Sequence, residues 1–331
     1  MKSNILGVTM GDSSGVGPEI LLKAAQEGKL SVPCVVYGDL VPLRKLNDQL
    51  RLGLELAPID SPAEWRAGRV NVIDLAMLRD GDLTPGRINA QSGKAAREYV
   101  IRATKAALAG ELAAIVTLPM NKEATQLTDP GFTGHTELIG ELCGSSDVTI
   151  MLASPDLIVT HVSTHCSLRE AIERCKKDRI RTILELTWHA VRRLKPGARV
   201  AVAGLNPHAG ENGLFGREEI DEIGPAVEWA RAQGWDIEGP FPPDTLFYMA
   251  VRRGKYDAVV CMYHDQGHIP SKLLDFEGGV NIALGLPIVR TSVYHGTAFD
   301  IAWKGLASTT SFEAALGMAV RLAELEASTV V

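Results

Sequence analysis

The chain has 331 residues, of which 46% are hydrophobic, enough to bury one large core or two ordinary ones. Its formal net charge is -6 and it has no long block of like charges, which argues against a nucleic-acid-binding groove. An anionic small molecule stays possible, because a local cluster of Lys, Arg and backbone N–H groups can hold a phosphate within an acidic protein.

The five cysteines lie far apart in the sequence and form no Cys-x-x-Cys pair. This spacing argues against a disulfide framework and against a thiolate zinc site, so we expect reduced, buried thiols. Only six weakly apolar residues precede Gly11, too few for a signal peptide, and no run approaches the ~18 apolar residues of a membrane span. We therefore expect a soluble, cytoplasmic protein.

Short β-branched runs alternate along the chain with longer stretches of helical period. The predicted strands are Ile5–Met10, Cys34–Tyr37, Val70–Ile73, Ala114–Thr117, Val148–Leu152, Leu157–Ser163, Arg199–Ala203, Ala258–Met262 and Ile288–Thr291. The predicted helices are Pro18–Glu27, Ser92–Leu108, Leu168–Leu194, Ile220–Gln233, Thr245–Arg253 and Ser311–Leu325. The alternation predicts an α/β protein of two lobes with largely parallel strands.

The segment Thr128–Gly134 is the stretch richest in Pro, Gly and Asp, so we place a crossing between lobes there. The final helix is expected to return to the first lobe. The first lobe would then hold residues 1–130 and 303–331, and the second would hold residues 131–302. A cleft between two such lobes is where a small-molecule site is expected.

The eight histidines are few enough to weigh one by one. His189 lies in the middle of a predicted helix and is interpreted as structural. His161 and His165 are four residues apart on a β-branched strand that runs into a loop, roughly 13 Å apart at about 3.3 Å per residue, so they cannot share one ion. At most one of the two is a metal ligand.

His208 and His264 each follow a predicted strand, in turns that contain Gly or Pro. Side chains at the carboxyl ends of strands in an open α/β sheet are in the position where ligands bind. Neutral imidazoles with a carboxylate nearby suit a borderline metal such as Zn²⁺. The spacing by itself does not prove a metal site, and the third ligand stays open between His161 and His165.

The segment Gly11–Ile20 follows a strand and opens a helix, with Pro18 suited to the first helical turn. Its glycines would let the backbone approach a ligand and would aim helix N–H groups at an anion. The spacing matches neither the dinucleotide Gly-x-Gly-x-x-Gly motif nor a P-loop. A tight strand-to-helix turn explains the segment equally well.

Taken together, the longer motifs resemble the 4-hydroxythreonine-4-phosphate dehydrogenase (PdxA) family over essentially the whole chain. The matching segments are Thr9–Asp12, Gly15–Glu19, Thr117–Lys122, Gly134–Glu137, Thr164–His165 with Leu168–Arg169, Asn206–Glu211, Pro243–Thr245, Tyr263–Gly267, Gly279–Asn281 and His295–Ala302. The resemblance implies an isocitrate and isopropylmalate dehydrogenase-like fold, with two α/β/α lobes around a central cleft, which is not a Rossmann fold. It also implies a homodimer whose active site takes residues from both subunits.

The resemblance further implies two cofactors, NAD and one divalent metal ion (Zn, Mg, Mn or Co), with the metal held by His165, His208 and His264. The implied substrate contacts are His135, Thr136, Lys272, Asn281 and Arg290; Lys and Arg suit phosphate and carboxylate groups. The implied cofactor contacts are Gly11, Asp12, His295, Gly296, Ala298 and Asp300. Without the resemblance, the segment from His295 would be interpreted as a Gly-containing helix start.

The implied reaction oxidises a secondary alcohol to a β-keto acid, which loses CO₂ to give a triose phosphate. Asp265 and Asp244 are candidates for proton handling or for orienting a ligand, although both could instead stabilise helix starts. Lys272 is a third candidate for a catalytic role.

Details of the sequence favour one branch of the family. His268 and Trp303 stand where the vitamin B6 enzymes are expected to have Leu and Gly. The motifs His161–His165 and Glu211–Gly216 also look more like the branch that oxidises 4-phospho-D-threonate and 4-phospho-D-erythronate. The alternatives are a 4-hydroxythreonine-4-phosphate dehydrogenase of pyridoxal phosphate biosynthesis and a cis-dihydrodiol dicarboxylate dehydrogenase.

Two positions depart from the family pattern. Ser13 replaces the usual Pro of the first loop, where Pro mainly stiffens a turn. Tyr294 replaces an Asp that commonly precedes His295, which puts the choice or affinity of the cofactor in question. Tyr294 is also the feature that favours a further alternative, a metal- or ligand-binding module without catalysis.

Overall fold

The computed structural model describes residues 3–30 and 32–328. The chain divides into two compact units. Unit 1 contains Met1–Ser146 and Leu286–Val331, and unit 2 contains Asp147–Gly285. The boundaries therefore lie after residues 146 and 285, whereas we expected them after residues 130 and 302. The segment Thr128–Gly134 that was expected to carry the crossing lies inside unit 1.

Unit 1 is built on a parallel set of strands. Their order is β3 (Leu56–Pro58), β4 (Val70–Asp74), β2 (Cys34–Gly38), β1 (Leu6–Thr9), β5 (Ala114–Thr117) and β12 (Arg290–Ser292). Every residue of β1, β2 and β5 is buried, as expected for parallel strands that are covered on both faces.

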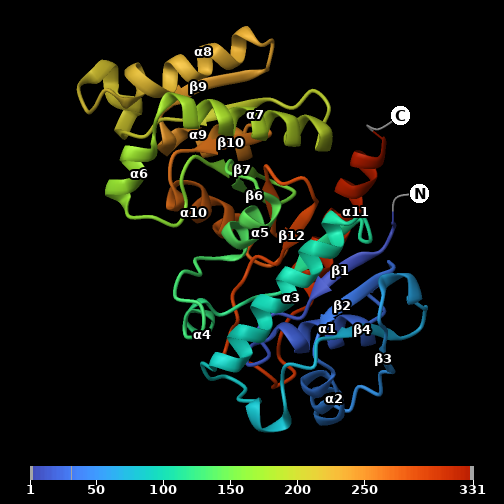
Figure 1. The fold of residues 1–331 in the computed structure, drawn as a ribbon. Helices are drawn as coiled ribbons and strands as arrows, with labels where there is room; N and C mark the ends of the chain where they lie inside the picture. The colour runs from blue at the N-terminus through green and yellow to red at the C-terminus, as the bar shows by residue number, and fades with distance from the viewer. Residues whose placement is uncertain (1–2, 31, 329–331) are drawn as a thin grey trace. The chain divides into compact units, whose positions relative to one another are not determined.

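The helices of unit 1 pack on these strands, and Figure 1 shows α3 lying alongside β1 and β2. They are α1 (Gly17–Gln26), α2 (Leu40–Gln49), α3 (Ala90–Leu108), α4 (Lys122–Gln126), α5 (His135–Cys143) and α11 (Thr310–Ser328). The long helix α3 begins where Asn89 accepts hydrogen bonds from the backbone of Gln91 and Ser92, a normal N-cap.

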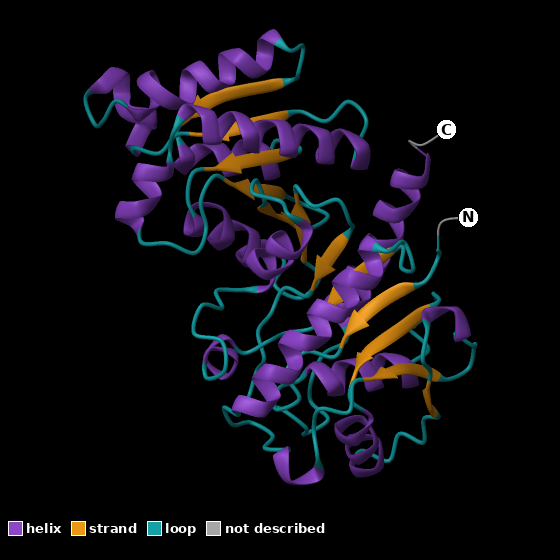
Figure 2. Cartoon of the chain, viewed as in Figure 1, coloured by secondary structure: helices purple, strands orange, loops and turns teal. Residues whose placement is uncertain are grey.

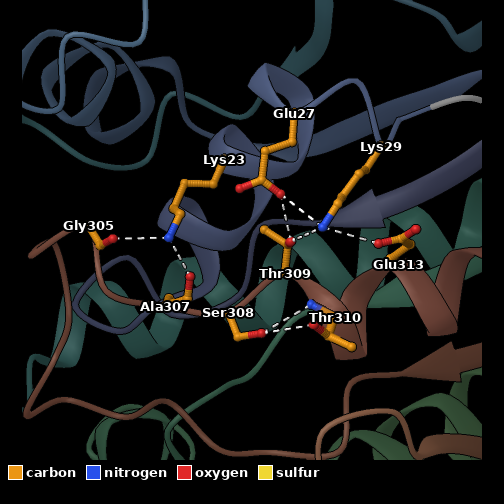
Figure 3. Close-up of polar contacts among 9 residues, drawn as sticks. All are labelled: Lys23, Glu27, Lys29, Gly305, Ala307, Ser308, Thr309, Thr310 and Glu313. Atoms are coloured by element: carbon orange, nitrogen blue, oxygen red, sulfur yellow. Dashed lines mark hydrogen bonds and ion pairs between the residues drawn. The ribbon is translucent and has the colours of Figure 1, made fainter.

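The segment just before α11 is fixed to α1 by polar contacts (Figure 3). Lys23 Nζ donates to the carbonyl oxygens of Gly305 and Ala307 at 3.0 and 2.6 Å. Lys29 Nζ lies 3.0 Å from Glu27 and 3.3 Å from Glu313, a residue of α11. These contacts hold the chain in place directly after the predicted cofactor segment.

Unit 2 has a mixed set of strands that alternate with helices (Figure 2). Their order is β11 (Val280–Leu284), β6 (Thr149–Ala153), β7 (Ile158–His161), β10 (Ala258–Cys261), β8 (Val200–Ala203) and β9 (Ile237–Phe241). The strands β7, β10, β8 and β9 are parallel, and β6 is antiparallel to both of its neighbours. The carboxyl ends of β7, β10 and β8 therefore lie at one edge.

The remaining elements of unit 2 are α6 (Leu168–Arg174), α7 (Lys177–Leu194), α8 (Gly224–Ala232), α9 (Pro243–Val251), α10 (His264–Leu274), the turn η3 (Pro207–Gly213) and the π-helical turn η4 (Glu219–Ile223). The single helix predicted over Leu168–Leu194 is wrong, because α6 and α7 are separated at Cys175 and Lys176. A carboxylate oxygen of Glu222 accepts a hydrogen bond from the Lys177 N–H at 2.7 Å and so stabilises the start of α7.

Each predicted strand is present, with ends that shift by up to two residues. The prediction missed β3, β9 and β11, whose sequences lack a continuous apolar run, and it missed the helices α2, α4, α5 and α10. His189 lies in α7, as predicted, with its ring edge-on to Trp235.

All five cysteines are free thiols. Cys34, Cys175 and Cys261 are buried as expected, whereas Cys143 and Cys166 are partly exposed. Burial raises the pKa of the Cys34 thiol to about 12, so this thiol stays protonated at neutral pH. Among the helices that the structure describes, none combines the length and the apolar character that a membrane crossing requires.

Candidate functional site

Three histidines follow three neighbouring parallel strands of unit 2. His165 comes after β7, His264 after β10 and His208 after β8, and β10 pairs with both of the other strands. The carboxyl edge of a parallel sheet is where α/β proteins place ligand contacts. The topology therefore brings the three predicted ligands to one edge of unit 2.

The rings of His165 and His264 lie close together, with centroids 5.9 Å apart. With a metal–nitrogen bond of about 2.1 Å, two imidazole centroids on one ion are at most about 6.5 Å apart. The separation of this pair lies within that limit. Within the described residues, however, no three His, Cys, Asp or Glu side chains converge closely enough to hold a metal as they stand.

His264 is fixed by its own neighbours. It is the first residue of α10 and not part of a loop, which corrects the sequence-based expectation. Its Nδ1 lies 2.7 Å from Asp265 Oδ1, and its ring stacks on that of His268 with centroids 3.5 Å apart and planes at 10°. A carboxylate accepts the Nδ1 proton, which leaves Nε2 as the free donor atom for a metal.

Two further histidines, His161 and His268, lie close to His264 but are not among the three predicted metal ligands. His161 is fully buried at the end of β7, and its Nε2 lies 3.2 Å from His268 Nδ1. The pKa of His161 is lowered to about 3, first by burial and then by His268. The pKa of His268 is lowered to about 4, first by burial and then by His264. Both rings are neutral at physiological pH.

His208 is displayed differently, on an unusual backbone. The φ angles of residues 208–212 are 53°, 51°, 79°, 42° and 54°, so His208, Ala209, Gly210, Glu211 and Asn212 form a left-handed turn. Each left-handed residue other than Gly costs roughly 1–2 kcal/mol. The exposed His208 ring contacts Phe215, with centroids 6.3 Å apart.

Unit 1 contains a buried cation. Arg290, 2% exposed, donates from Nε and Nη2 to Thr117 Oγ1 at 3.1 and 2.7 Å, while its Nη1 is buried without a hydrogen-bond partner. The pKa of Arg290 is lowered to about 10 by burial, against the opposing effect of Glu137. A buried guanidinium with an unused N–H group is suited to an anionic ligand.

His135 lies near this arginine, at the start of α5. Its Nε2 is buried without a hydrogen-bond partner. The pKa of His135 is lowered to about 3, first by burial and then by the positive charge of Arg290. The adjacent Thr136 is buried. The predicted contacts His135 and Arg290 therefore both belong to unit 1 and interact electrostatically.

The other predicted substrate contacts belong to unit 2. Asn281 lies on β11, and its Oδ1 is buried without a hydrogen-bond partner. Lys272 lies in the last turn of α10, with Nζ 5.7 Å from the centre of the Phe276 ring. Asp244 and Asp265 lie in the first turns of α9 and α10, where a carboxylate is favoured by the helix dipole, and neither is the N-cap residue.

The predicted cofactor residues gather around the first loop of unit 1. Asp12 is buried, which raises the pKa of its carboxyl group, and it accepts hydrogen bonds from Ser92 Oγ and from the Ser14 N–H. Gly11 has φ +74°, and a Cβ there would lie 2.5 Å from the Pro119 carbonyl oxygen, so no other residue fits. In the structure these two residues shape the loop, and their contact with a cofactor stays a prediction.

The segment from His295 onward packs against that loop. The Val16 N–H donates to the Thr297 carbonyl oxygen at 3.0 Å, and Trp303 Nε1 donates to the Ser13 carbonyl oxygen at 2.9 Å. The unusual Tyr294 is buried, and its backbone N–H donates to Ser311 Oγ at the start of α11. Gly296 and Asp300 are exposed, and Ala298 has φ +42°.

Comparison with known proteins places the chain in a family. Residues 29–319 match the family model described as pyridoxal phosphate biosynthetic protein PdxA. The chain belongs to the PdxA family. Over 97% of its length it is 46% identical to the whole of a D-threonate 4-phosphate dehydrogenase of Pectobacterium atrosepticum. Over 95% of its length it is 42% identical to 94% of a 4-hydroxythreonine-4-phosphate dehydrogenase of Desulforapulum autotrophicum.

Solved structures agree with this assignment. The crystal structure of a 4-hydroxythreonine-4-phosphate dehydrogenase from Klebsiella pneumoniae has a TM-score of 0.86 and 47% identity, covering 97% of this chain and 100% of that one. An isocitrate dehydrogenase from Methylococcus capsulatus, with a TM-score of 0.51 and 14% identity over 99% of this chain and 88% of that one, shares the fold alone. The expected family and the isocitrate dehydrogenase-like α/β fold are confirmed, and the curated relatives named above are dehydrogenases.

Proposed function

We propose that this member of the PdxA family oxidises the 3-hydroxyl of 4-phospho-D-threonate or 4-phospho-D-erythronate with NAD and a divalent metal ion. The β-keto acid that forms would then lose CO₂ to give a triose phosphate. Relatives at 46% identity over 97% of the chain carry the name D-threonate 4-phosphate dehydrogenase, which supports this substrate class.

The structural observation that carries the proposal is the buried Arg290. Its Nη1 has no hydrogen-bond partner, and neither has Nε2 of His135, whose pKa the charge of Arg290 helps to lower. A buried cation with unused donors favours a ligand with a carboxylate or phosphate group over a neutral one. Thr117 holds the guanidinium in place, so little ordering is needed when an anion binds.

We propose that His165, His208 and His264 hold the divalent metal. A divalent ion bound there would act as a Lewis acid that lowers the pKa of the substrate hydroxyl. The chain's own contribution is to present three imidazoles that follow neighbouring strands of unit 2. The contact between Asp265 Oδ1 and His264 Nδ1 selects the tautomer with a free Nε2 lone pair.

Five polar side chains are proposed to bind the substrate, namely His135, Thr136, Lys272, Asn281 and Arg290. The buried Oδ1 of Asn281 is an acceptor suited to a hydroxyl group. Lys272, Asp265 and Asp244 are also proposed to hold or move a proton. Lys272 and Asp265 lie on α10, the helix that begins with His264, and Asp244 lies in the first turn of α9.

NAD is proposed to bind at the first loop of unit 1 and at the segment that packs on it. The proposed contacts are Gly11, Asp12, His295, Gly296, Ala298 and Asp300. The tight contact of the two segments supports this, because a Cβ at Gly15 would lie 2.9 Å from the Thr297 carbonyl oxygen. The two segments are therefore in direct contact, and the proposed nucleotide contacts come from both of them.

We also propose that the chain forms a homodimer. Ile269, Leu273 and Phe276 are 62%, 85% and 56% exposed and are spaced three or four residues apart along and just beyond α10. Such a strip of large apolar side chains is typical of a subunit interface. Light scattering of the purified protein should give twice the mass of the chain, 35.6 kDa; a monomer that still turns over would contradict a shared active site.

The test of the proposed function is NADH absorbance with metal present. 4-Phospho-D-threonate, 4-phospho-D-erythronate and 4-phosphohydroxy-L-threonine are offered in parallel. We expect NADH from the first two at a higher kcat/KM than from the third. No signal from any of them, despite measurable NAD binding, would refute the assignment.

The second candidate is 4-hydroxythreonine-4-phosphate dehydrogenase activity in pyridoxal phosphate biosynthesis. The description of the matched family and the name of the relative at 42% identity favour it. The same assay distinguishes the two candidates, because a preference for the aminated substrate would assign the chain to this branch.

A further inference from the structure

The left-handed turn that carries His208 packs against a buried carboxylate. Glu219 lies at the start of η4 and is 4% exposed. One of its oxygens, Oε1, accepts hydrogen bonds from the Leu205 N–H at 2.7 Å and from the Asn206 N–H at 2.8 Å. The other oxygen, Oε2, accepts from Asn206 Nδ2 at 3.0 Å. Three amide donors on the residues just before His208 therefore converge on one carboxylate.

The same carboxylate also lies against the turn itself. A Cβ at Gly210 would lie 2.7 Å from Glu219 Oε2, and a Cβ at Gly204 would lie 3.1 Å from Glu219 Oε1. The carboxylate thus contacts the chain on both sides of His208. Only glycine leaves room for it at position 210, where φ is +79°.

A strained backbone persists only where the surrounding structure holds it in place. His208, Ala209, Glu211 and Asn212 all have positive φ without being glycine. The hydrogen bonds of Glu219 reach the base of this turn, and Glu222 of the same π-helical turn is bonded to the start of α7. The carboxylate therefore links the strained turn to the body of unit 2.

We propose that Glu219 is a positioning residue for His208: its buried carboxylate holds in place the left-handed turn from which the imidazole would bind the metal. This inference rests on the proposed function, because it assumes that His208 is a metal ligand. In this proposal Glu219 binds neither the substrate nor the metal. Its effect is transmitted through the backbone of residues 204–210.

The first test is a titration of the metal-free protein with Co²⁺, followed by visible absorbance. Glu219→Gln keeps the size of the side chain but turns an NH₂ group toward amide donors, so the turn loses an acceptor. We expect Co²⁺ affinity to fall at least about tenfold, in the range typical for groups that orient a metal ligand. A folded Glu219→Gln protein with wild-type Co²⁺ affinity would overturn the proposal.

The matched control is Glu218→Gln. Glu218 is the neighbouring acid, and its Oε2 accepts from the same Asn206 Nδ2 at 2.7 Å, but it makes no contact with the backbone N–H groups of Leu205 or Asn206. We expect its Co²⁺ affinity to stay within about twofold of wild type. An equal loss in both variants would mean that any charge near Asn206 suffices, which would contradict a specific role for Glu219.

A double variant separates positioning from a general structural effect. If Glu219 acts through His208, then His208→Ala combined with Glu219→Gln should bind Co²⁺ no more weakly than His208→Ala alone. If the double variant instead loses Co²⁺ affinity by the product of the two single losses, the proposal is overturned. If His208→Ala itself leaves Co²⁺ affinity and absorbance unchanged, the proposed metal site has failed as well as this inference.

Gly210→Ala provides an independent route if Glu219→Gln fails to fold. The added methyl group would displace Glu219 Oε2 from the turn, although the glutamate itself is not replaced. We expect a similar loss of Co²⁺ affinity, with a far-ultraviolet circular dichroism spectrum like that of wild type. Unchanged affinity in Gly210→Ala would contradict the proposed coupling.

Discussion

His208 and His264 each follow a strand of the same parallel set, yet they are held by different means. The ring of His264 is fixed by side chains, with Asp265 at its Nδ1 and His268 stacked on its face. The ring of His208 stands on a left-handed turn whose backbone is held by Glu219. One edge of a sheet can therefore present similar side chains either through local ring contacts or through a strained backbone.

The largest effect is expected from His208→Ala. Removing this proposed metal ligand should reduce kcat/KM by at least about a hundredfold, since even groups that only orient ligands contribute 10–100-fold. The thermal transition should shift little, because His208 is exposed on a turn. Steady-state kinetics and a thermal melt measure the two effects, with the exposed His189→Ala as control; wild-type rates in His208→Ala would refute the metal site.

Arg290→Lys is expected to act on the substrate and not on the metal. Loss of the guanidinium fork removes the hydrogen bonds to Thr117 and the unused Nη1 donor. Hydrogen bonds to charged groups contribute roughly 1.5–3 kcal/mol, so KM for the phosphorylated acid should rise about 10–100-fold. The exposed Arg102→Lys on α3 is the control, and an unchanged KM in Arg290→Lys would remove Arg290 from the substrate site.

Asp265→Asn tests whether the carboxylate at Nδ1 holds His264 in the tautomer that suits a metal. An amide can donate to Nδ1 as well as accept from it, so the tautomer with a free Nε2 is no longer selected. We expect Co²⁺ affinity and kcat to fall about tenfold. The control is Asp178→Asn, an exposed aspartate in the first turn of α7; equal effects in the two variants would mean that only helix stability is involved.

The last prediction concerns the pH dependence of stability, which no activity assay measures. The pKa of His135 is lowered from 6.5 to about 3 in the folded chain, so below pH 6.5 the unfolded state binds a proton that the folded state does not. Stability from this group is therefore complete above pH 6.5 and is lost toward pH 3, by at most about 1.4 kcal/mol per pH unit. The free energy of unfolding, measured in urea at several pH values, should depend less steeply on pH over this range in His135→Gln. An unchanged dependence on pH would contradict the lowered pKa of His135.

Much of the fold follows from local sequence. The strands predicted from apolar β-branched runs are all present, because parallel strands that are buried on both faces must be apolar. The break between α6 and α7 could not be predicted, since the helical period continues through Cys175 and the residue that stabilises the start of α7, Glu222, lies far along the chain. Helix α10 was missed because its histidines, glycine and Pro270 are typical of a loop.

The candidate site was only partly predictable, because contacts between residues far apart in the sequence also shape it. Strand ends pointed to His208 and His264, and only the family resemblance chose His165 over His161. The burial of His161 against His268 arises from residues 107 positions apart, which no local pattern reveals. Glu219 gave no signal either, because a glutamate before an apolar residue is ordinary on a helix surface.

The central claim is tested most directly by following NADH from 4-phospho-D-threonate with metal-depleted protein, before and after Co²⁺ is added back. We predict no turnover without metal, restored turnover with Co²⁺ in the wild type, and none in His208→Ala at the same concentration. Full activity of the metal-depleted protein, or no NADH from this substrate under any condition, would contradict the claim.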